Sequence, residues 1–221
     1  IERLIERVRR ANRVDKIIIA TSSEASDDPL SNFADSIGVP CYRGPLNDVM
    51  ERICGAAETY ECDTIVDILG DNPLVDPRLI DHVIATYESG DYSAAISLTG
   101  EYDLDTGDKA LFALGIRVQM YDLAVAKSYK DHPDFIGEGR PEAGYIFCQP
   151  ELFPTAHVEA VGDWARLNRP EINFAVNYQK NFEFSERVFT ALHPSNPNFS
   201  ILDVLDYIDD NPESLYLLGP E

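Results

Sequence analysis

One short stretch of this sequence combines residue types that suit metal and phosphate chemistry: the run Gly70-Asp71-Asn72-Pro73-Leu74-Val75-Asp76-Pro77. It follows a β-branched segment at 64–69 and precedes an apolar pattern with helical spacing, so we expect it to connect a buried strand to a helix. Ligands of open α/β sheets bind at the carboxyl ends of the strands. Asp71 is therefore a candidate ligand for a divalent cation, the alternative being that it only caps a turn. Asp76 is placed to cap the helix.

Segments of strand type and helix type alternate over the first 99 residues. Strands are expected at 15–21, 39–43, 64–69 and 93–98. Helices are expected at 1–11, 28–38, 48–60 and 76–90. This alternation predicts the α/β class, with right-handed crossovers and a mostly parallel sheet between helices.

The alternation becomes irregular after Thr99. Further strands are expected at 111–120, 145–148 and 171–176, and further helices at 122–129 and 178–192. A last helix is expected after Ser200, which has the spacing of a capping box with Asp203. Without an internal repeat or a linker, we expect a single domain over residues 1–221 with an irregular half at 100–221.

Composition and charge limit the classes of function. The chain has 221 residues, 44% of them hydrophobic, and lacks an apolar stretch long enough to cross a membrane, which indicates a soluble globular protein without membrane association. Its 39 acidic and 18 basic residues give a net charge of −21, which argues against nucleic acid as a partner. Only five of the bases are Lys, and we take this acidic, Lys-poor composition as a hypothesis of adaptation to high salt.

Cysteine and histidine residues do not form a recognisable ligand set. The four cysteines lack C-x-x-C spacing and the four histidines lack a metal-binding spacing. Free thiols favour a reducing, cytoplasmic compartment, and we expect no signal peptide before the helical pattern at Ile1.

Two runs of the sequence, 39–52 and 65–77, resemble the cytidylyltransferases of the spore-coat polysaccharide type, relatives of the CMP-Kdo and CMP-sialic acid synthetases. The likeness is specific in Arg43-Gly44 and in Gly70-Asp71-x-Pro73, and it extends to 196–205, nearly the whole chain. It implies a nucleotide-diphospho-sugar transferase fold of Rossmann-like type. It also implies an Mg²⁺-dependent enzyme that joins CTP to a sugar or sugar acid, releases pyrophosphate and forms a homodimer through its carboxyl-terminal half.

The resemblance assigns roles to particular residues. It makes Asp71 the catalytic carboxylate that holds Mg²⁺ against the phosphates, and Asn177 occupies the position of a second metal ligand. Arg43, Asp48 and Arg52 match the loop and helix that line the nucleotide. Asp48 and Arg52 are also four residues apart on a predicted helix, so an ion pair on a solvated face is an equal alternative for these two.

Several positions depart from the family pattern. Asn177 stands where the family has an acid, and an amide oxygen is a weaker Mg²⁺ ligand than a carboxylate. Arg117 and Gln119 also stand where the family has acidic residues. The segment from Arg140 to Ile146 keeps only part of the corresponding family motif. We assign Arg117 and Arg140 to the substrate, where a cation would meet a carboxylate or phosphate on a different sugar.

The family's opening strand and Gly-rich basic loop are missing from this sequence, so we expect the chain as given to be inactive and to be part of a longer enzyme. Two alternatives stay open. One is a non-catalytic family member that binds a nucleotide sugar or a protein partner. The other is a nucleotidyltransferase that uses another base.

Overall fold

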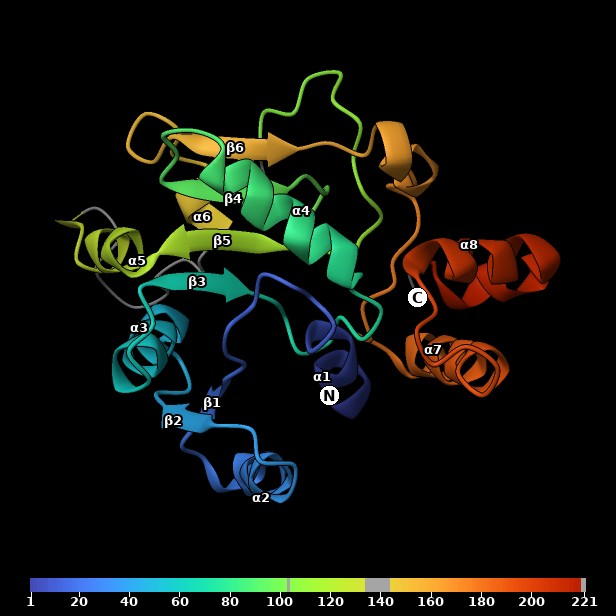
Figure 1. The fold of residues 1–221 in the computed structure, drawn as a ribbon, viewed down its shortest axis with the longest axis horizontal. Coiled ribbons are helices and arrows are strands. Elements are labelled where there is room, and N and C mark those ends of the chain that lie inside the picture. The colour runs from blue at the N-terminus through green and yellow to red at the C-terminus, as the bar shows by residue number, and fades with distance from the viewer. Residues whose placement is uncertain (103, 134–143, 220–221) are drawn as a thin grey trace.

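The computed structural model describes residues 1–102, 104–133 and 144–219. Helix α1 (Glu2–Val8) leads into a small parallel sheet of two strands, β1 (Ile19–Ser22) and β2 (Cys41–Gly44). A short 3-10 turn, η1 (Ala25–Asp27), and helix α2 (Asp28–Ser36) connect these strands, and together they form a separate corner of the molecule (Figure 1).

The larger sheet has four strands in the order β3-β5-β4-β6. Their bounds are β3 (Thr64–Asp67), β4 (Ala94–Ser97), β5 (Gln119–Asp122) and β6 (Thr155–Val158). β5 is antiparallel to both β3 and β4, whereas β6 is parallel to β4. The prediction of a mostly parallel sheet is therefore wrong for this part of the fold.

The connections between the strands explain the mixed sheet. Helix α4 (Pro77–Glu88) joins β3 to β4, and these two strands run in the same direction, as a strand–helix–strand unit requires. The described residues between β4 and β5 contain no helix, so β5 can return antiparallel between its two neighbours.

Helices cover both faces of the four-stranded sheet (Figure 1). α4 packs on one face, in the same apolar cluster as Ala95. Ala94 and Ile96 belong to a second cluster on the opposite face, with residues of α3 (Val49–Thr59), α5 (Leu123–Lys130) and α6 (Gly144–Phe147). All four residues of β4 are buried, which agrees with the apolar run from Ala94 to Ile96.

The carboxyl-terminal helices lie to one side of the larger sheet (Figure 1). They are η3 (Gly162–Leu167), α7 (Gln179–Leu192), α8 (Ile201–Asp210) and η4 (Pro212–Leu217). The predicted capping box of α8 is confirmed, because Ser200 and Asp203 exchange side-chain hydrogen bonds with each other's backbone N–H. Among the described residues, no helix is both long and apolar enough to cross a membrane.

Three predicted strands are wrong in whole or in part. Residues 145–148 fall largely in α6, since a short apolar run does not distinguish a buried strand from a buried helix. Residues 171–176 form no strand and contribute only an isolated bridge between Leu114 and Asn173. The strand expected at 111–120 begins only at Gln119, and β6 was not predicted.

Candidate active site

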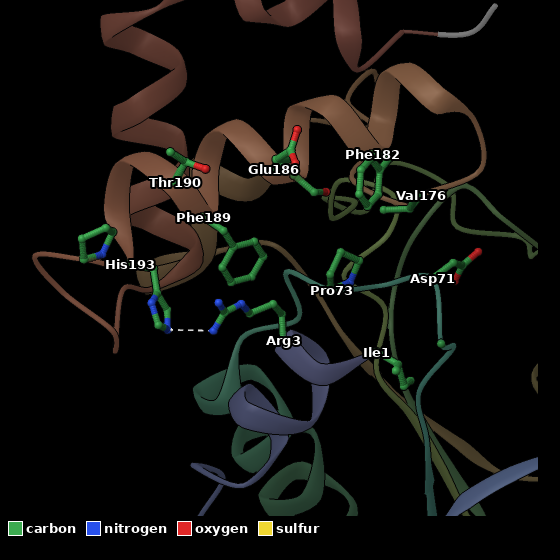
Figure 2. Close-up of a pocket in the computed structure, with 13 residues that line it drawn as sticks. Ile1, Arg3, Asp71, Pro73, Val176, Phe182, Glu186, Phe189, Thr190 and His193 are labelled. Atoms are coloured by element: carbon green, nitrogen blue, oxygen red, sulfur yellow. Dashed lines mark hydrogen bonds between the residues drawn. The ribbon is translucent and has the colours of Figure 1, made fainter. Parts of the chain in front are cut away.

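A cavity of about 770 Å³ lies between the start of α1, the 70–76 loop after β3, and one side of α7. Its walls are mainly apolar, formed by Ile1, Pro73, Val176, Phe182 and Phe189. Figure 2 shows Asp71 at one end of this cavity and the hydrogen-bonded pair Arg3 and His193 at the other. Its volume is in the range of pockets that hold small molecules.

Asp71 presents a carboxylate oxygen with no partner. Its Oδ1 atom is buried and accepts no hydrogen bond from the described residues. Burial raises the pKa of the Asp71 carboxyl, while its own backbone N–H and the positive charge of Arg117 act in the opposite direction. Asp71 also lines the cavity, and a bound cation would stabilise a buried carboxylate that is short of hydrogen-bond donors.

Asn177 is brought to the Asp71 loop by the chain segment before it. The backbone N–H of Val176 donates to the carbonyl oxygen of Asp71 at 2.9 Å, and Asn177 is the next residue along the chain. Asn177 itself is exposed. The structure thus brings the two predicted metal-ligand positions to the same edge of the fold, although they are far apart in sequence.

These residues fit a magnesium ion in one particular way. Among the described residues, no group of three or more His, Cys, Asp or Glu side chains could enclose a metal. Mg²⁺ usually keeps several waters and is bound by one or two carboxylates together with substrate phosphates. Asp71 could supply one such carboxylate and Asn177 an amide oxygen, which would leave the other positions of the ion to water and substrate phosphates.

Two other polar residues of the loop, Asn72 and Asp76, are fully buried. Asp76 caps α4, as predicted: its carboxylate accepts from the backbone N–H of Arg78 at 2.9 Å and from that of Ile201 at 2.9 Å. The Arg78 guanidinium also donates to this carboxylate, and its hydrogen bonds, together with the two backbone contacts, hold the pKa of Asp76 below its ordinary value despite burial. Asn72 is fully buried, and its carboxamide has no hydrogen-bond partner among the described residues.

Arg43 uses its donors within the amino-terminal sheet. It donates to the carbonyl oxygens of Ser22 at 3.0 Å and Glu24 at 2.7 Å, and it forms an ion pair of 2.6 Å with Asp28. These contacts tie β2 to the loop after β1 and to the start of α2. As arranged, the guanidinium holds this corner together.

Asp48 and Arg52 lie at the start of α3. Asp48 is the N-cap and accepts from the backbone N–H of Glu51 at 2.9 Å. Arg52 donates to the carbonyl oxygens of Pro45 at 2.7 Å and Leu46 at 3.1 Å. Both side chains therefore stabilise the turn that leads into the helix.

Arg117 lies near Asp71 but is paired within the protein. Its side chain is 4% exposed and forms an ion pair with Glu101, and its guanidinium lies 4.3 Å from the ring centroid of Tyr102. Thr99 also donates to the Glu101 carboxylate, at 3.1 Å. The positive charge predicted to meet a substrate is therefore neutralised by Glu101. Arg140 lies outside the described residues.

Sequence reasoning missed the polar network around Arg117. Gln119 donates to Asp67 at 2.7 Å and accepts from the hydroxyl of Tyr102 at 3.2 Å, which ties β3 and β5 to the loop after β4. Asp67 and Gln119 are also register partners in the sheet. A single sequence carries no signal for this pairing, because the partners lie on different elements and the direction of β5 was not known.

Comparisons with known proteins show which family the chain is similar to. A family model described as cytidylyltransferase matches residues 1–121. The spore coat polysaccharide biosynthesis protein SpsF of Bacillus subtilis is 24% identical over 221 residues, covering 96% of this chain and 83% of that protein. A 3-deoxy-manno-octulosonate cytidylyltransferase of Pelobacter propionicus is 34% identical over 84 residues, covering 38% of this chain and 32% of its own length.

The fold is similar to that of a solved structure. A cytidylyltransferase from Leptospira borgpetersenii superposes with a TM-score of 0.80 at 21% identity, covering 96% of this chain and 84% of its own. The predicted resemblance is thus confirmed by a family model that matches more than half of the chain, together with a shared α/β fold. The chain belongs to the cytidylyltransferase family.

Proposed function

We propose that this chain is the core of an Mg²⁺-dependent enzyme that joins CTP to a sugar or sugar acid and releases pyrophosphate. The observation that carries the proposal is Asp71, which lines a cavity after a strand of a cytidylyltransferase fold and whose buried Oδ1 accepts no hydrogen bond from the described residues. The sugar class is supported by the names of the relatives, which concern spore-coat polysaccharide and 3-deoxy-manno-octulosonate.

In the proposed reaction, a sugar hydroxyl oxygen attacks the α-phosphorus of CTP, and the bond from that phosphorus to the β-phosphate oxygen breaks. Negative charge grows on the leaving pyrophosphate and has to be neutralised. Asp71 would hold Mg²⁺, with the Asn177 oxygen as a weaker second ligand, and the ion would supply that neutralising charge. The hydrogen bond from Val176 to Asp71 fixes the relative position of these two segments.

The other predicted site residues contribute to the proposed function in different ways. Arg43, Asp48 and Arg52 make internal contacts in the structure, so their contribution to CTP binding is to shape the loop that faces the nucleotide. The charge of Arg117 is neutralised by Glu101, so its guanidinium would bind the carboxylate of a sugar acid only while it is also paired with Glu101. The homodimer remains part of the proposal by family resemblance.

The second candidate is a family member that binds a nucleotide or nucleotide sugar without turnover. It is favoured by one specific observation, namely that Arg43, Arg52 and Arg117 donate hydrogen bonds within the protein. Catalysis by charge stabilisation needs donors that are free to meet the reacting group.

Release of pyrophosphate distinguishes the two candidates. A longer form of the protein that carries the family's Gly-rich basic loop is incubated with CTP, Mg²⁺ and 3-deoxy-manno-octulosonate, and pyrophosphate is measured with and without the sugar. Sugar-dependent release, lost in Asp71→Asn and kept in Asp210→Asn, supports the enzyme; Asp210 is an exposed acid of α8. CTP binding without release over a panel of sugar acids and sugar phosphates refutes catalysis by this chain and favours the binding protein.

A further inference from the structure

Arg7 of α1 is a fully buried arginine whose hydrogen bonds all go to backbone carbonyls. Only 1% of the surface of Arg7 is exposed to solvent. Nε donates to the carbonyl oxygen of Val75 at 2.8 Å, Nη2 to that of Leu74 at 3.4 Å, and Nη1 to that of Phe199 at 3.0 Å. The guanidinium also lies 4.8 Å from the centroid of the Phe199 ring.

Burying this group is costly, so its contacts have to compensate for the lost hydration. Among the described residues, no carboxylate forms an ion pair with Arg7; Asp76 acts on it only through charge. Burial lowers the pKa of Arg7 to about 10, which is still high enough to keep the guanidinium charged at neutral pH. An apolar side chain of similar volume would avoid this desolvation cost. An apolar side chain, however, would not form the three hydrogen bonds that Arg7 makes.

Two of those carbonyls belong to the loop that carries Asp71. Leu74 and Val75 are three and four residues beyond Asp71, and both side chains are fully buried. Within the loop, the backbone N–H of Val75 donates to the carbonyl of Asn72 at 3.3 Å. A shift of Leu74 and Val75 is therefore transmitted through a tight turn to Asp71.

The loop is held at both of its ends. At its start, the N–H of Val176 donates to the carbonyl of Asp71. At its end, Asp76 accepts from Ile201, while Arg7 joins the loop to Phe199 two residues earlier in that segment. Arg7 thus connects three parts of the chain, namely α1, the Asp71 loop and the segment before α8.

We propose that Arg7 is a positioning residue for the metal site: its fork of donors fixes the carbonyls of Leu74 and Val75 and thereby holds Asp71 in place at the edge of the cavity. The inference rests on the proposed function, because it takes Asp71 as the metal ligand. A lysine has one ammonium group on a flexible stem and does not reproduce the planar fork, so Arg7→Lys keeps the charge but loses the geometry.

The test compares metal affinity in three variants of the full chain. Mn²⁺ is titrated in the presence of CTP and followed by electron paramagnetic resonance. Because partners that orient a metal ligand typically contribute about 10- to 100-fold to affinity, Arg7→Lys and Arg7→Met should weaken Mn²⁺ binding by at least about tenfold. Leu205→Ala, in the buried face of α8, is the control for lost stability and should leave the affinity unchanged.

A second readout does not depend on metal. Hydrogen exchange of the Val176 amide reports its bond to Asp71, and this exchange should accelerate in Arg7→Lys relative to the amides of β4. In Leu205→Ala the ratio of the two rates should stay as in the unaltered chain.

The possible results separate the two claims. If the unaltered chain binds no Mn²⁺ with CTP, the proposed function fails, while the exchange ratio still decides whether Arg7 holds the loop. If the chain binds Mn²⁺ and both Arg7 variants match it in affinity and in exchange ratio, the positioning role is overturned. It is equally overturned if Leu205→Ala weakens Mn²⁺ binding as much as Arg7→Lys does.

Discussion

Replacing Gly115 by Ala should disturb both the fold and the candidate metal site. Gly115 has a backbone φ of +79°, which an L residue with a side chain rarely adopts. An added Cβ atom would lie 2.0 Å from the backbone nitrogen of Ala175 and 2.5 Å from the carbonyl carbon of Phe174. Both contacts are with backbone, so no side-chain rotation relieves them. The 173–176 segment has to move away from Leu114.

The expected loss of stability has two parts. The left-handed conformation costs a non-glycine residue about 1–2 kcal/mol. Forcing an extra methyl group into a packed region costs a further ~1–3 kcal/mol. Gly115→Ala should therefore lower the free energy of unfolding by about 2–5 kcal/mol. Because the displaced segment ends at Val176, which bonds to Asp71, the affinity for Mg²⁺ with CTP should also fall.

Urea denaturation of the variant measures the first effect and calorimetry the second. Gly162→Ala is the matched control, since Gly162 also has a positive φ, of +56°, but no atom lies within 4 Å of its added Cβ. The control should lose only the conformational part, about 1–2 kcal/mol. A loss at position 115 no larger than that at 162, or unchanged affinity in Gly115→Ala, would refute this reasoning.

Three further predictions concern charge. Hydrogen bonds from Ser22 and Thr21 lower the pKa of Asp27 from 3.8 to about 2, so the stabilising effect of its carboxylate is complete above pH 3.8 and is lost as the pH falls through 2. Asp27→Asn should therefore lower stability at pH 7 and have little effect at pH 2 in urea titrations. Glu101→Ala leaves the buried charge of Arg117 unpaired and should lower the free energy of unfolding by ~3 kcal/mol. Arg117→Met should cost less, because the carboxylate that it leaves unpaired, on Glu101, is partly exposed. Equal losses of unfolding free energy in the two variants would contradict this asymmetry. With a net charge of −21, the unfolding free energy should rise from low to molar potassium chloride, and a flat or falling dependence would remove the high-salt hypothesis.

The part of the fold that the sequence predicts well is the part with regular apolar periodicity and clear end signals. The Asp76 cap with Pro77, and the capping box of Ser200 and Asp203, correctly located the starts of α4 and α8. Strand direction could not be predicted, because the sequence of β5 has the same short strand pattern whether the strand runs parallel or antiparallel to its neighbours. The 171–176 segment has strand composition, yet its pairing with another segment is limited to the single β-bridge between Asn173 and Leu114.

The candidate site could be predicted only in part. The position of Gly70 and Asp71 could be predicted, because the spacing of apolar residues on either side shows where a strand ends and where the next helix begins. The pairing of Arg117 with Glu101 and the carbonyl contacts of Arg7 depend on tertiary packing between distant segments. No local pattern in one sequence encodes such contacts.

The central claim is that the Asp71 carboxylate holds Mg²⁺ for CTP, and isothermal titration of CTP into the chain with and without Mg²⁺ tests it most directly. We predict binding heat in Mg²⁺ that disappears when the ion is removed, is lost in Asp71→Asn and is retained in Asp210→Asn. Equal CTP affinity in Asp71→Asn and the unaltered chain, or affinity that does not depend on Mg²⁺, would contradict the account.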